Sequence, residues 1–382
     1  MNKQLLTHQV KYSKDYKDKA FVVHEGGTGK TVCACVWLKD GRDEYALVIC
    51  PKRIVLKWKG ELIKWETKAT VVSKEDFKKM PVEKWSAIVV DEADEFASPL
   101  FSKGRSQLAT ALYTLVKKYP ETPVMLCTAT PIRSNPWNLH TLLCYLGIYI
   151  DKTKWRDHFF SLEMRPFLRR PAYFPKLDWR QRIRAVLEKY ADIVLLKDCI
   201  DNVPPVTETI VKTPCGAFVA PLETEPTALF VAEHRWEQKN KVKAILEIAK
   251  EYRKVLVVAH YVEQVESLAQ ELSKDRETFM VHGGVDDQES ILKKANEVDE
   301  CFLVCQASLG SGFDANTFSC VVFASMSYAV RNYIQMTYRV RRIHDLHPVQ
   351  MYYLLGGRCD KAVFENVKKG LDFIPSHWKY VA

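Results

Sequence analysis

The stretch AFVVHEGGTGKT, residues 20–31, decides the fold. Its first half is a short apolar run, and its second half is a glycine-rich turn that ends in Lys-Thr. A buried strand that turns through glycines into a helix leaves backbone N–H groups free at the helix N-terminus, where they bind negative charge. The stretch therefore predicts a phosphate-binding loop in an α/β domain, formed by Gly26, Gly27, Thr28 and Gly29.

The residues that follow these glycines indicate ATP and Mg²⁺ as the ligands. Lys30 is expected to reach the β- and γ-phosphates, and the Thr31 hydroxyl to bind Mg²⁺. The strict pattern has glycine where His24 stands, although related loops relax that position. Taken alone, the stretch is equally compatible with a glycine-rich turn followed by a chance Lys-Thr pair.

A second motif, SAIVVDEAD at residues 86–94, supports the nucleotide interpretation. It is an apolar strand that ends in clustered carboxylates. A strand buried on both faces would not end in three acids without a cation or a lysine nearby. We expect Asp91 to hold Mg²⁺ and Glu92 to orient and deprotonate the attacking water. The alternative, an acidic strand end that faces solvent, is weakened by the upstream glycine loop.

Two further polar positions fit the same site. Gln9 lies 21 residues before Lys30 and could read the adenine edge through its amide, although a surface glutamine would look the same. Thr128 and Thr130 follow another apolar run and could link the acidic cluster to a second lobe through their hydroxyls. The tripeptide Thr-Ala-Thr is too common to be specific.

Short apolar runs alternate with amphipathic helical stretches along the chain, which predicts parallel sheets covered on both faces. The runs form two clusters, so we expect an α/β fold with two parallel-sheet lobes. The expected division is a first lobe at 1–150, a helical insertion and linker at 151–226, and a second lobe at 227–382. The expected strands are 20–24, 45–50, 87–90, 123–127, 255–259, 301–304, 320–323 and 349–354, and the expected helices include 53–65, 108–119, 262–273 and 329–340.

Composition narrows the class of protein. The chain has 382 residues, 47% of them hydrophobic, which indicates globular domains. Its net charge of +9 favours a polyanionic partner, although a merely basic surface would give the same value. Eleven cysteines are scattered without zinc-type spacing, as expected of reduced thiols. No apolar run reaches membrane-spanning length, so we expect a soluble cytoplasmic protein with no membrane partner. The compact two-lobe layout suggests a monomer from a bacterium or a virus-infected cell.

Several segments resemble the superfamily 2 helicases, and within them the Swi/Snf-type DNA translocases. Those segments are CPKRIVLKWKGELIKW (50–65), IVLLKDCIDNVPPVTETIV (193–211), VLVVAHYVEQVESLAQEL (255–272) and the continuous stretch at 302–343. The resemblance implies two RecA-like lobes in tandem, with ATP bound in the cleft between them. It also implies an ATP-dependent helicase or translocase that acts on DNA.

The same resemblance assigns residues of the second lobe. Gly310, Gly312 and Asp314 fall in the family's loop between nucleic acid and nucleotide, and Gln335, Arg339 and Arg342 fall on its QxxxRxxR motif. Both arginines would reach across the cleft to the γ-phosphate, where guanidinium groups stabilise transition-state charge. A helical spacing of three would place them on one face. A basic helix that faces solvent is the alternative.

Departures from the family pattern leave a rival open. Tyr338 replaces a glycine, His344-Asp345 replaces Gly-Gln, and DEAD at residues 91–94 replaces the more usual DEAH. The literal DEAD raises RNA helicases, but their Pro-Thr-Arg-Glu-Leu and His-Arg-x-Gly-Arg-x-Gly-Arg segments are missing from the sequence.

Nucleic-acid contacts are expected on both lobes, through basic and hydroxyl side chains that bind phosphates without reading sequence. The candidates are Lys52, Arg53, Thr128, Ser308 and Arg331. An Arg- and aromatic-rich stretch at 164–184 is either a duplex-contacting protrusion or a solvated helical face. Besides the DNA motor and the RNA helicase, a nucleotide-switched assembly factor with little turnover stays open. A metabolic P-loop kinase would leave the second-lobe motifs unexplained.

Overall fold

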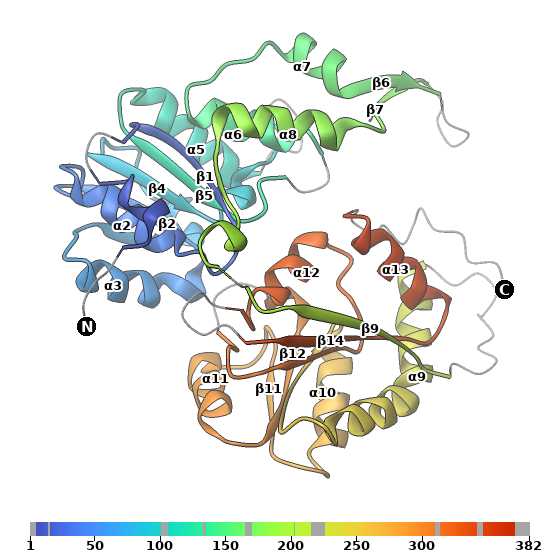
Figure 1. Cartoon of the computed structure of the whole chain (residues 1–382). Coiled ribbons are helices and arrows are strands. Elements are labelled where there is room, and N and C mark those ends of the chain that lie inside the picture. Colours follow the sequence, from blue (N-terminus) through green and yellow to red (C-terminus); the bar gives the residue numbers. More distant parts are fainter. Residues whose placement is uncertain are drawn as a thin grey trace. The chain divides into compact units, whose positions relative to one another are not determined.

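The computed structural model describes residues 5–13, 16–100, 106–132, 135–164, 170–201, 203–214, 226–309, 314–341 and 347–370. The chain divides into two compact units, Met1–Asp201 and Asn202–Ala382 (Figure 1). Each unit is built on a six-stranded parallel sheet covered by helices. The predicted α/β class with two parallel sheets in tandem is therefore confirmed.

The sheet of the first unit has the strand order β3-β2-β4-β5-β1-β8. Its four central strands carry the apolar runs expected from the sequence, and their side chains alternate between the two faces of the sheet. In β4, for example, Ile88 and Val90 pack on one face while Ala87 and Val89 pack on the other. The strands are β1 (Lys19–His24), β2 (Ala46–Cys50), β3 (Thr70–Ser73), β4 (Ala87–Asp91), β5 (Val124–Thr128) and β8 (Asp192–Val194).

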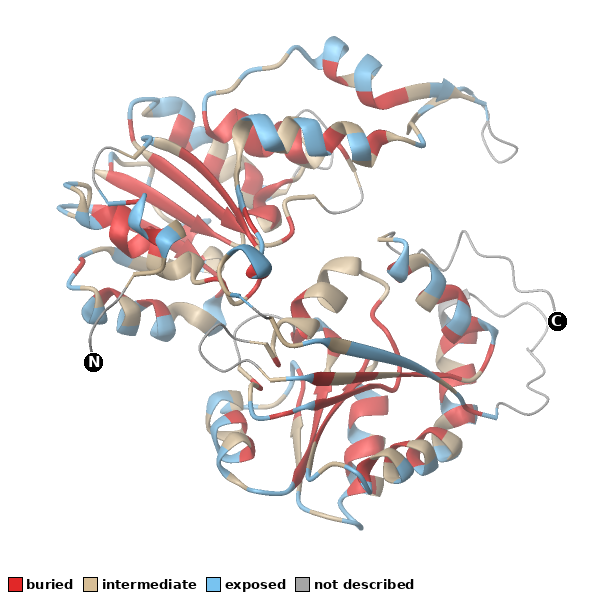
Figure 2. Cartoon of the chain, in the orientation of Figure 1, coloured by how far each residue is buried: buried red, intermediate tan, exposed pale blue. Residues whose placement is uncertain are grey.

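Helices cover both faces of this sheet, which is why its central strands are wholly buried (Figure 2). One face packs against α2 (Lys30–Lys39) and α3 (Val55–Lys64). The other packs against α5 (Gln107–Lys118), α6 (Trp137–Tyr145), α7 (Lys152–Phe159) and α8 (Trp179–Tyr190). Short helical elements connect them, namely α1 (Thr7–Val10), η1 (Lys52–Ile54), α4 (Lys74–Phe77), η2 (Ala93–Phe96) and η3 (Leu196–Asp198).

The segment expected as helical insertion and linker, 151–226, also contains strands. An antiparallel hairpin of β6 (Phe160–Glu163) and β7 (Ala172–Pro175) connects α7 to α8 and lies apart from the first sheet (Figure 1). Strand β8 then joins the edge of the first sheet, and β9 (Val206–Lys212) joins the edge of the second. Within the Arg-rich stretch, Arg182 and Arg184 pair with acids of their own helix region.

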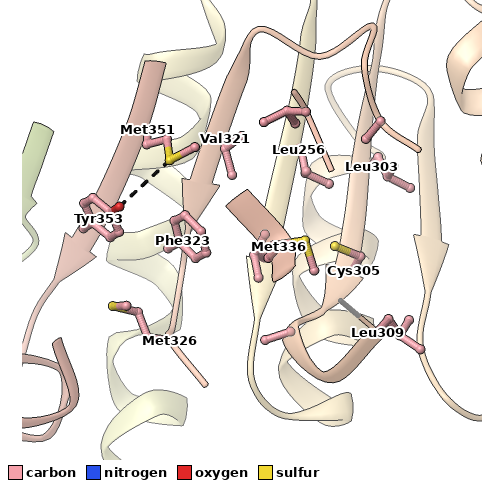
Figure 3. Close-up of a cluster of buried hydrophobic side chains, with 14 of the residues drawn as sticks. Leu256, Leu303, Cys305, Leu309, Val321, Phe323, Met326, Met336, Met351 and Tyr353 are labelled. Carbon is pink, nitrogen blue, oxygen red and sulfur yellow. Dashed lines mark hydrogen bonds between the residues drawn. The ribbon is translucent and has the colours of Figure 1, made fainter. Parts of the chain in front are cut away.

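The second sheet has the order β11-β12-β10-β13-β14-β9 and is again wholly parallel. Figure 3 shows one of its buried faces, where Leu256, Leu303, Phe323 and Tyr353 belong to one apolar cluster. Its remaining strands are β10 (Lys254–Ala259), β11 (Thr278–Val281), β12 (Cys301–Gln306), β13 (Cys320–Phe323) and β14 (Val349–Leu355). Its helical elements are α9 (Pro226–Ala249), α10 (Val262–Leu272), α11 (Gln288–Glu297), η4 (Ala307–Leu309), α12 (Val330–Thr337) and α13 (Arg358–Lys368).

A buried ion cluster ties three elements of the second unit together. The fully buried Lys241 of α9 donates to the Asp360 carboxylate of α13 at 2.6 Å and to the Ala324 carbonyl, just after β13, at 2.8 Å. Glu237 lies 3.2 Å from the same ammonium. Buried charges persist only when they are paired in this way, so the cluster fixes α13 against α9.

Two general expectations can be compared with the described residues. Their ten cysteines are free, nine of them buried. No helix within the described ranges is long and apolar enough to cross a membrane.

Candidate nucleotide site

Strand register brings the glycine loop and the acidic motif to one edge of the first sheet. Strands β1 and β4 flank β5, where Cys127 is paired with Val22 on one side and with Asp91 on the other. Asp91 thus lies about 10 Å from Val22 across two strand spacings. The loop begins where β1 ends, two residues later. Parallel strands end at the same edge, so the loop and the carboxylates face a common space.

Gly29 closes the loop, and its position strongly favours glycine over every other residue. Its φ of 87° lies in the left-handed region that favours glycine. A Cβ built there would stand 2.4 Å from Nε2 of Gln9. The Thr28 hydroxyl donates to the Glu25 carbonyl at 2.8 Å, which folds the loop back on itself. Helix α2 starts at the next residue, so its free N–H groups point toward the loop.

Lys30 and Thr31 occupy the first turn of α2, as the sequence predicts. The Lys30 ammonium donates to the carbonyls of His24 and Glu25 at 2.9 and 3.2 Å, which holds it against the loop. The cation also lowers the pKa of Asp91, so the two charges act on a common space. Gly26, Gly27 and Thr28 complete the loop between β1 and α2.

Asp91 and Glu92 form an electrostatically strained pair at the end of β4. Burial, together with repulsion from Glu92, raises the pKa of Asp91 to about 6, against the lowering effects of Trp58 and Lys30. A bound cation would relieve this repulsion, so the carboxylate chemistry fits Mg²⁺. Glu92 has a φ of 51°, a left-handed conformation rare for residues other than glycine. Such strain is concentrated at functional sites.

Trp58 positions the Asp91 carboxylate. Its indole N–H donates to Oδ2 of Asp91 at 2.9 Å, and the backbone N–H of Glu92 donates to Oδ1 at 2.9 Å. Trp58 is buried, and its indole N–H can only donate a hydrogen bond. The bond therefore fixes the orientation of the Asp91 carboxylate.

We expect Trp58→Phe to raise the Mg²⁺ concentration for half-maximal ATP hydrolysis by about tenfold, as loss of a bond that orients a metal ligand typically does. Saturating Mg²⁺ should restore most of the turnover, because Asp91 itself remains. Trp65→Phe is the matched control, since the Trp65 indole donates to Glu61, on the same helix, at 3.2 Å. A magnesium titration of both variants gives the answer, and identical curves would rule out the orienting role.

Thr128 does not lie where a nucleic-acid contact requires it. Its side chain has no exposed surface, and its hydroxyl donates to the buried Asp94 at 3.0 Å. The same oxygen accepts the backbone N–H of Thr130 at 3.0 Å. The assignment of Thr128 to nucleic-acid binding is therefore wrong, because buried hydroxyls are taken up by local partners. Thr128 instead joins β5 to the acidic motif.

The hydroxyl of Thr128 should contribute to stability. Thr128→Val should lower the free energy of unfolding by about 1–3 kcal/mol, because Asp94 and the Thr130 N–H both lose a buried partner. Thr130→Val should be nearly neutral, since the buried Thr130 hydroxyl has no hydrogen-bond partner among the described residues. Urea unfolding followed by tryptophan fluorescence compares the two variants, and equal losses would contradict this account.

Gln9 is buried beside the phosphate loop, 5% exposed. Its Oε1 accepts the backbone N–H of Leu6 at 3.0 Å, and its Nε2 donates to the Thr28 carbonyl at 3.3 Å. His8 contacts the same carbonyl at 2.9 Å. An amide has two donor hydrogens and two acceptor lone pairs, so one of each is left for a nucleotide base.

The second unit carries the remaining predicted residues, and α12 is shorter than the expected helix. It ends at Thr337, so Arg339 lies in the turn that follows, where its carbonyl accepts the Ala315 N–H at 2.9 Å. The sequence predicted that Arg339 and Arg342 share one face of a helix, but α12 ends before Arg339. Gln335 is buried and Asp314 is half-buried. Gly310, Gly312 and Arg342 lie outside the described residues.

The nucleic-acid candidates differ in exposure. Lys52 and Arg53 are exposed in η1, directly before α3, and Ser308 is exposed in η4. Arg331 is half-buried in the first turn of α12. All four are placed where a polymer could reach at least part of the side chain.

The structure adds residues that the motifs did not single out. Trp58 lies in the segment 50–65 that resembles the helicase family, but the sequence assigned it no role. Within the acidic motif, Asp94 accepts the Thr128 hydroxyl. His8 and Asp192 lie outside the predicted set, and they contact Thr28 of the loop and His24 before it. Asp192 has no local signal, because its contact with His24 joins positions 168 residues apart.

Comparison with known proteins identifies a domain in the second unit. Residues 238–344 match the family described as the helicase conserved C-terminal domain, which supports the resemblance of that unit to helicases. No curated protein matches the chain. A solved structure titled as the Sulfolobus solfataricus SWI2/SNF2 ATPase core in complex with dsDNA is similar over 96% of this chain and 91% of that chain, at 15% identity and a TM-score of 0.43.

Proposed function

We propose that this chain, whose second unit carries a helicase conserved C-terminal domain, is an ATP-dependent DNA translocase or helicase. It would couple ATP hydrolysis to movement along duplex or branched DNA, or to its remodelling. The observation that carries the proposal is the meeting of the phosphate loop with Asp91 and Glu92 at one sheet edge. With a helicase-type domain in the same chain, ATP hydrolysis at that edge would drive movement along DNA.

The first unit would bind the nucleotide. Backbone N–H groups of Gly26, Gly27, Thr28 and Gly29 would surround the phosphates, and the Lys30 ammonium would turn from the loop carbonyls to the β- and γ-phosphates. Gln9 would bind the adenine edge while it stays in contact with Thr28, so base and phosphate recognition share one bonded segment.

Thr31 and Asp91 would hold Mg²⁺ between the loop and β4. The ion supplies charge neutralisation of the phosphates when it is bound. Glu92 would take a proton from the attacking water, and its left-handed backbone would keep the carboxylate aimed away from the strand.

Arg339, with Arg342, would stabilise the charge that develops on the γ-phosphate. Both belong to the second unit, so hydrolysis would require the two units to close on the nucleotide. Arginine is suited to this role because its fork of N–H donors matches phosphate oxygens and its charge is permanent. Opening after hydrolysis would then move one unit relative to the other along the polymer.

Nucleic acid would be held by Lys52 and Arg53 of the first unit and by Ser308 and Arg331 of the second. Such contacts neutralise phosphates and are independent of sequence, which agrees with the net charge of +9. Each unit would therefore bind phosphates of the nucleic acid. An RNA helicase is the second candidate, favoured by the literal DEAD of residues 91–94.

Displacement of a triplex-forming strand tests movement on duplex DNA. The full chain, with ATP and Mg²⁺, should displace a third strand from a duplex, whereas Lys30→Ala should not. Separation of a short RNA duplex without triplex displacement would favour the RNA helicase. Tight ATP binding with neither activity would favour the nucleotide-switched assembly factor.

A further inference from the structure

The segment 192–199, which we call the connector, runs along the phosphate loop before the chain enters the second unit. Its strand β8 pairs with the last residues of β1, so that Asp192 is paired with Val22 and Val194 with His24. The 3-10 turn η3 follows directly. The connector is therefore the edge of the sheet at the place where the loop begins.

The backbone of the connector is bonded to the loop on both sides of Glu25. The Glu25 N–H donates to the Val194 carbonyl at 2.9 Å, and the Leu196 N–H donates to the Glu25 carboxylate at 2.7 Å. At its far end, the Cys199 thiol lies 3.4 Å from Nδ1 of His8, whose Nε2 contacts the Thr28 carbonyl. The loop is thus held by the connector at several points.

Asp192 is the charged centre of this arrangement. Its carboxylate lies 2.9 Å from Nε2 of the fully buried His24, accepts the Tyr12 hydroxyl, and pairs with Lys11 at 2.5 Å. Burial alone would raise the pKa of Asp192, but hydrogen bonds from His24, Lys11 and Tyr12 hold it well below its usual range. The group is therefore a permanent anion beneath the loop.

His24 explains why such an anion is present. It stands where the strict phosphate-loop pattern has glycine, and its ring is completely buried. Burial lowers the pKa of His24, and its Nε2 lies 2.9 Å from the Asp192 carboxylate. A carboxylate can only accept, so Asp192 fixes the hydrogen on Nε2 and with it the orientation of the ring.

We propose that Asp192 is a positioning residue that holds the phosphate loop in its nucleotide-binding conformation through His24 and Tyr12. The proposal rests on the proposed function, since it concerns the same nucleotide site. Asp192 acts through its contacts with His24, Tyr12 and Lys11, which shape the loop, so it governs nucleotide binding rather than the chemical step. Lys30, Glu92 and Arg339 would stay intact when it is changed.

The test compares Asp192→Asn with Asp198→Asn in the full chain. Asp198 is the matched control, because it lies in the connector and its carboxylate accepts the Leu195 N–H at 2.9 Å within the η3 turn. The readouts are KM and kcat for ATP and the affinity for the fluorescent nucleotide mant-ADP. Asp192→Asn should raise KM and the mant-ADP Kd roughly tenfold, as loss of a charged hydrogen bond does, with kcat within about threefold of wild type.

Tyr12→Phe serves if Asp192→Asn fails to fold. It removes one hydroxyl donor to Asp192 and keeps the buried ring, and a rise of about threefold in both constants is expected. Unchanged mant-ADP affinity in the folded variants, or a fall in kcat at constant KM, would overturn the proposal. Because mant-ADP binding does not need turnover, a wild type that binds the nucleotide without hydrolysing ATP would defeat the proposed function and still decide the role of Asp192.

Discussion

Glu92→Gln is expected to lower kcat for ATP hydrolysis by about 10²–10⁴-fold, the usual contribution of a general base. The amide has nearly the shape of the carboxylate but cannot take a proton from water. Nucleotide affinity should stay close to that of wild type, because in the proposed site Lys30 and the loop, rather than Glu92, would bind the phosphates. The variant would therefore bind ATP and fail to turn it over.

Glu95→Gln is the matched control for this prediction. Glu95 lies three residues after Glu92, directly after the acidic motif, and its carboxylate pairs with Lys74. Single-turnover hydrolysis and mant-ADP binding should be measured for both variants. Equal loss of turnover in the two would mean that acidic charge at this edge matters without a dedicated base at Glu92.

Arg339→Ala should reduce nucleic-acid-stimulated turnover by about 10³–10⁵-fold, the range seen for an arginine that stabilises the transferring phosphate. The loss should appear in kcat and leave mant-ADP affinity almost unchanged, because in the proposed mechanism the guanidinium would reach the γ-phosphate only during hydrolysis. Arg339→Lys should rescue little, since an ammonium lacks the planar fork of donors.

Arg341→Ala controls for the loss of positive charge in the same turn. Arg341 lies off the QxxxRxxR positions, and its guanidinium donates to the Pro204 carbonyl at 3.4 Å. Its replacement should change turnover far less than Arg339→Ala. If Arg339→Ala retained most of its turnover, hydrolysis would not depend on an arginine from the second unit.

The fold was predictable where buried strands appear in the sequence as short runs of apolar residues. The central strands β2, β4, β10 and β13 are runs of apolar residues, and apolar residues of that kind are buried from both sides in a parallel sheet. The edge strands β8 and β9 were not predicted, because β8 is short and β9 is largely exposed. Each also pairs with a strand that is distant in the sequence. Helix α12 ends earlier than its periodicity suggests, at Thr337.

The site followed the same division. The positions of Lys30, Thr31, Asp91 and Glu92 were predictable because they belong to a glycine loop and an acidic motif at the carboxyl ends of β1 and β4, where parallel sheets collect polar residues. Thr128 was placed with nucleic acid because a hydroxyl after a strand looks alike whether it faces solvent or a buried carboxylate. Asp192 could not be predicted from the sequence, because its proposed role depends on a contact with His24, 168 residues away.

The most direct test of the central claim is steady-state ATP hydrolysis by the full chain, alone and with duplex DNA, single-stranded DNA or RNA. The account predicts slow basal turnover that rises strongly with duplex DNA and disappears in Lys30→Ala. Stimulation should weaken as salt is added, because phosphate contacts release counterions. Turnover that is the same with and without every polymer would contradict the claim that this chain is a nucleic-acid-dependent ATPase.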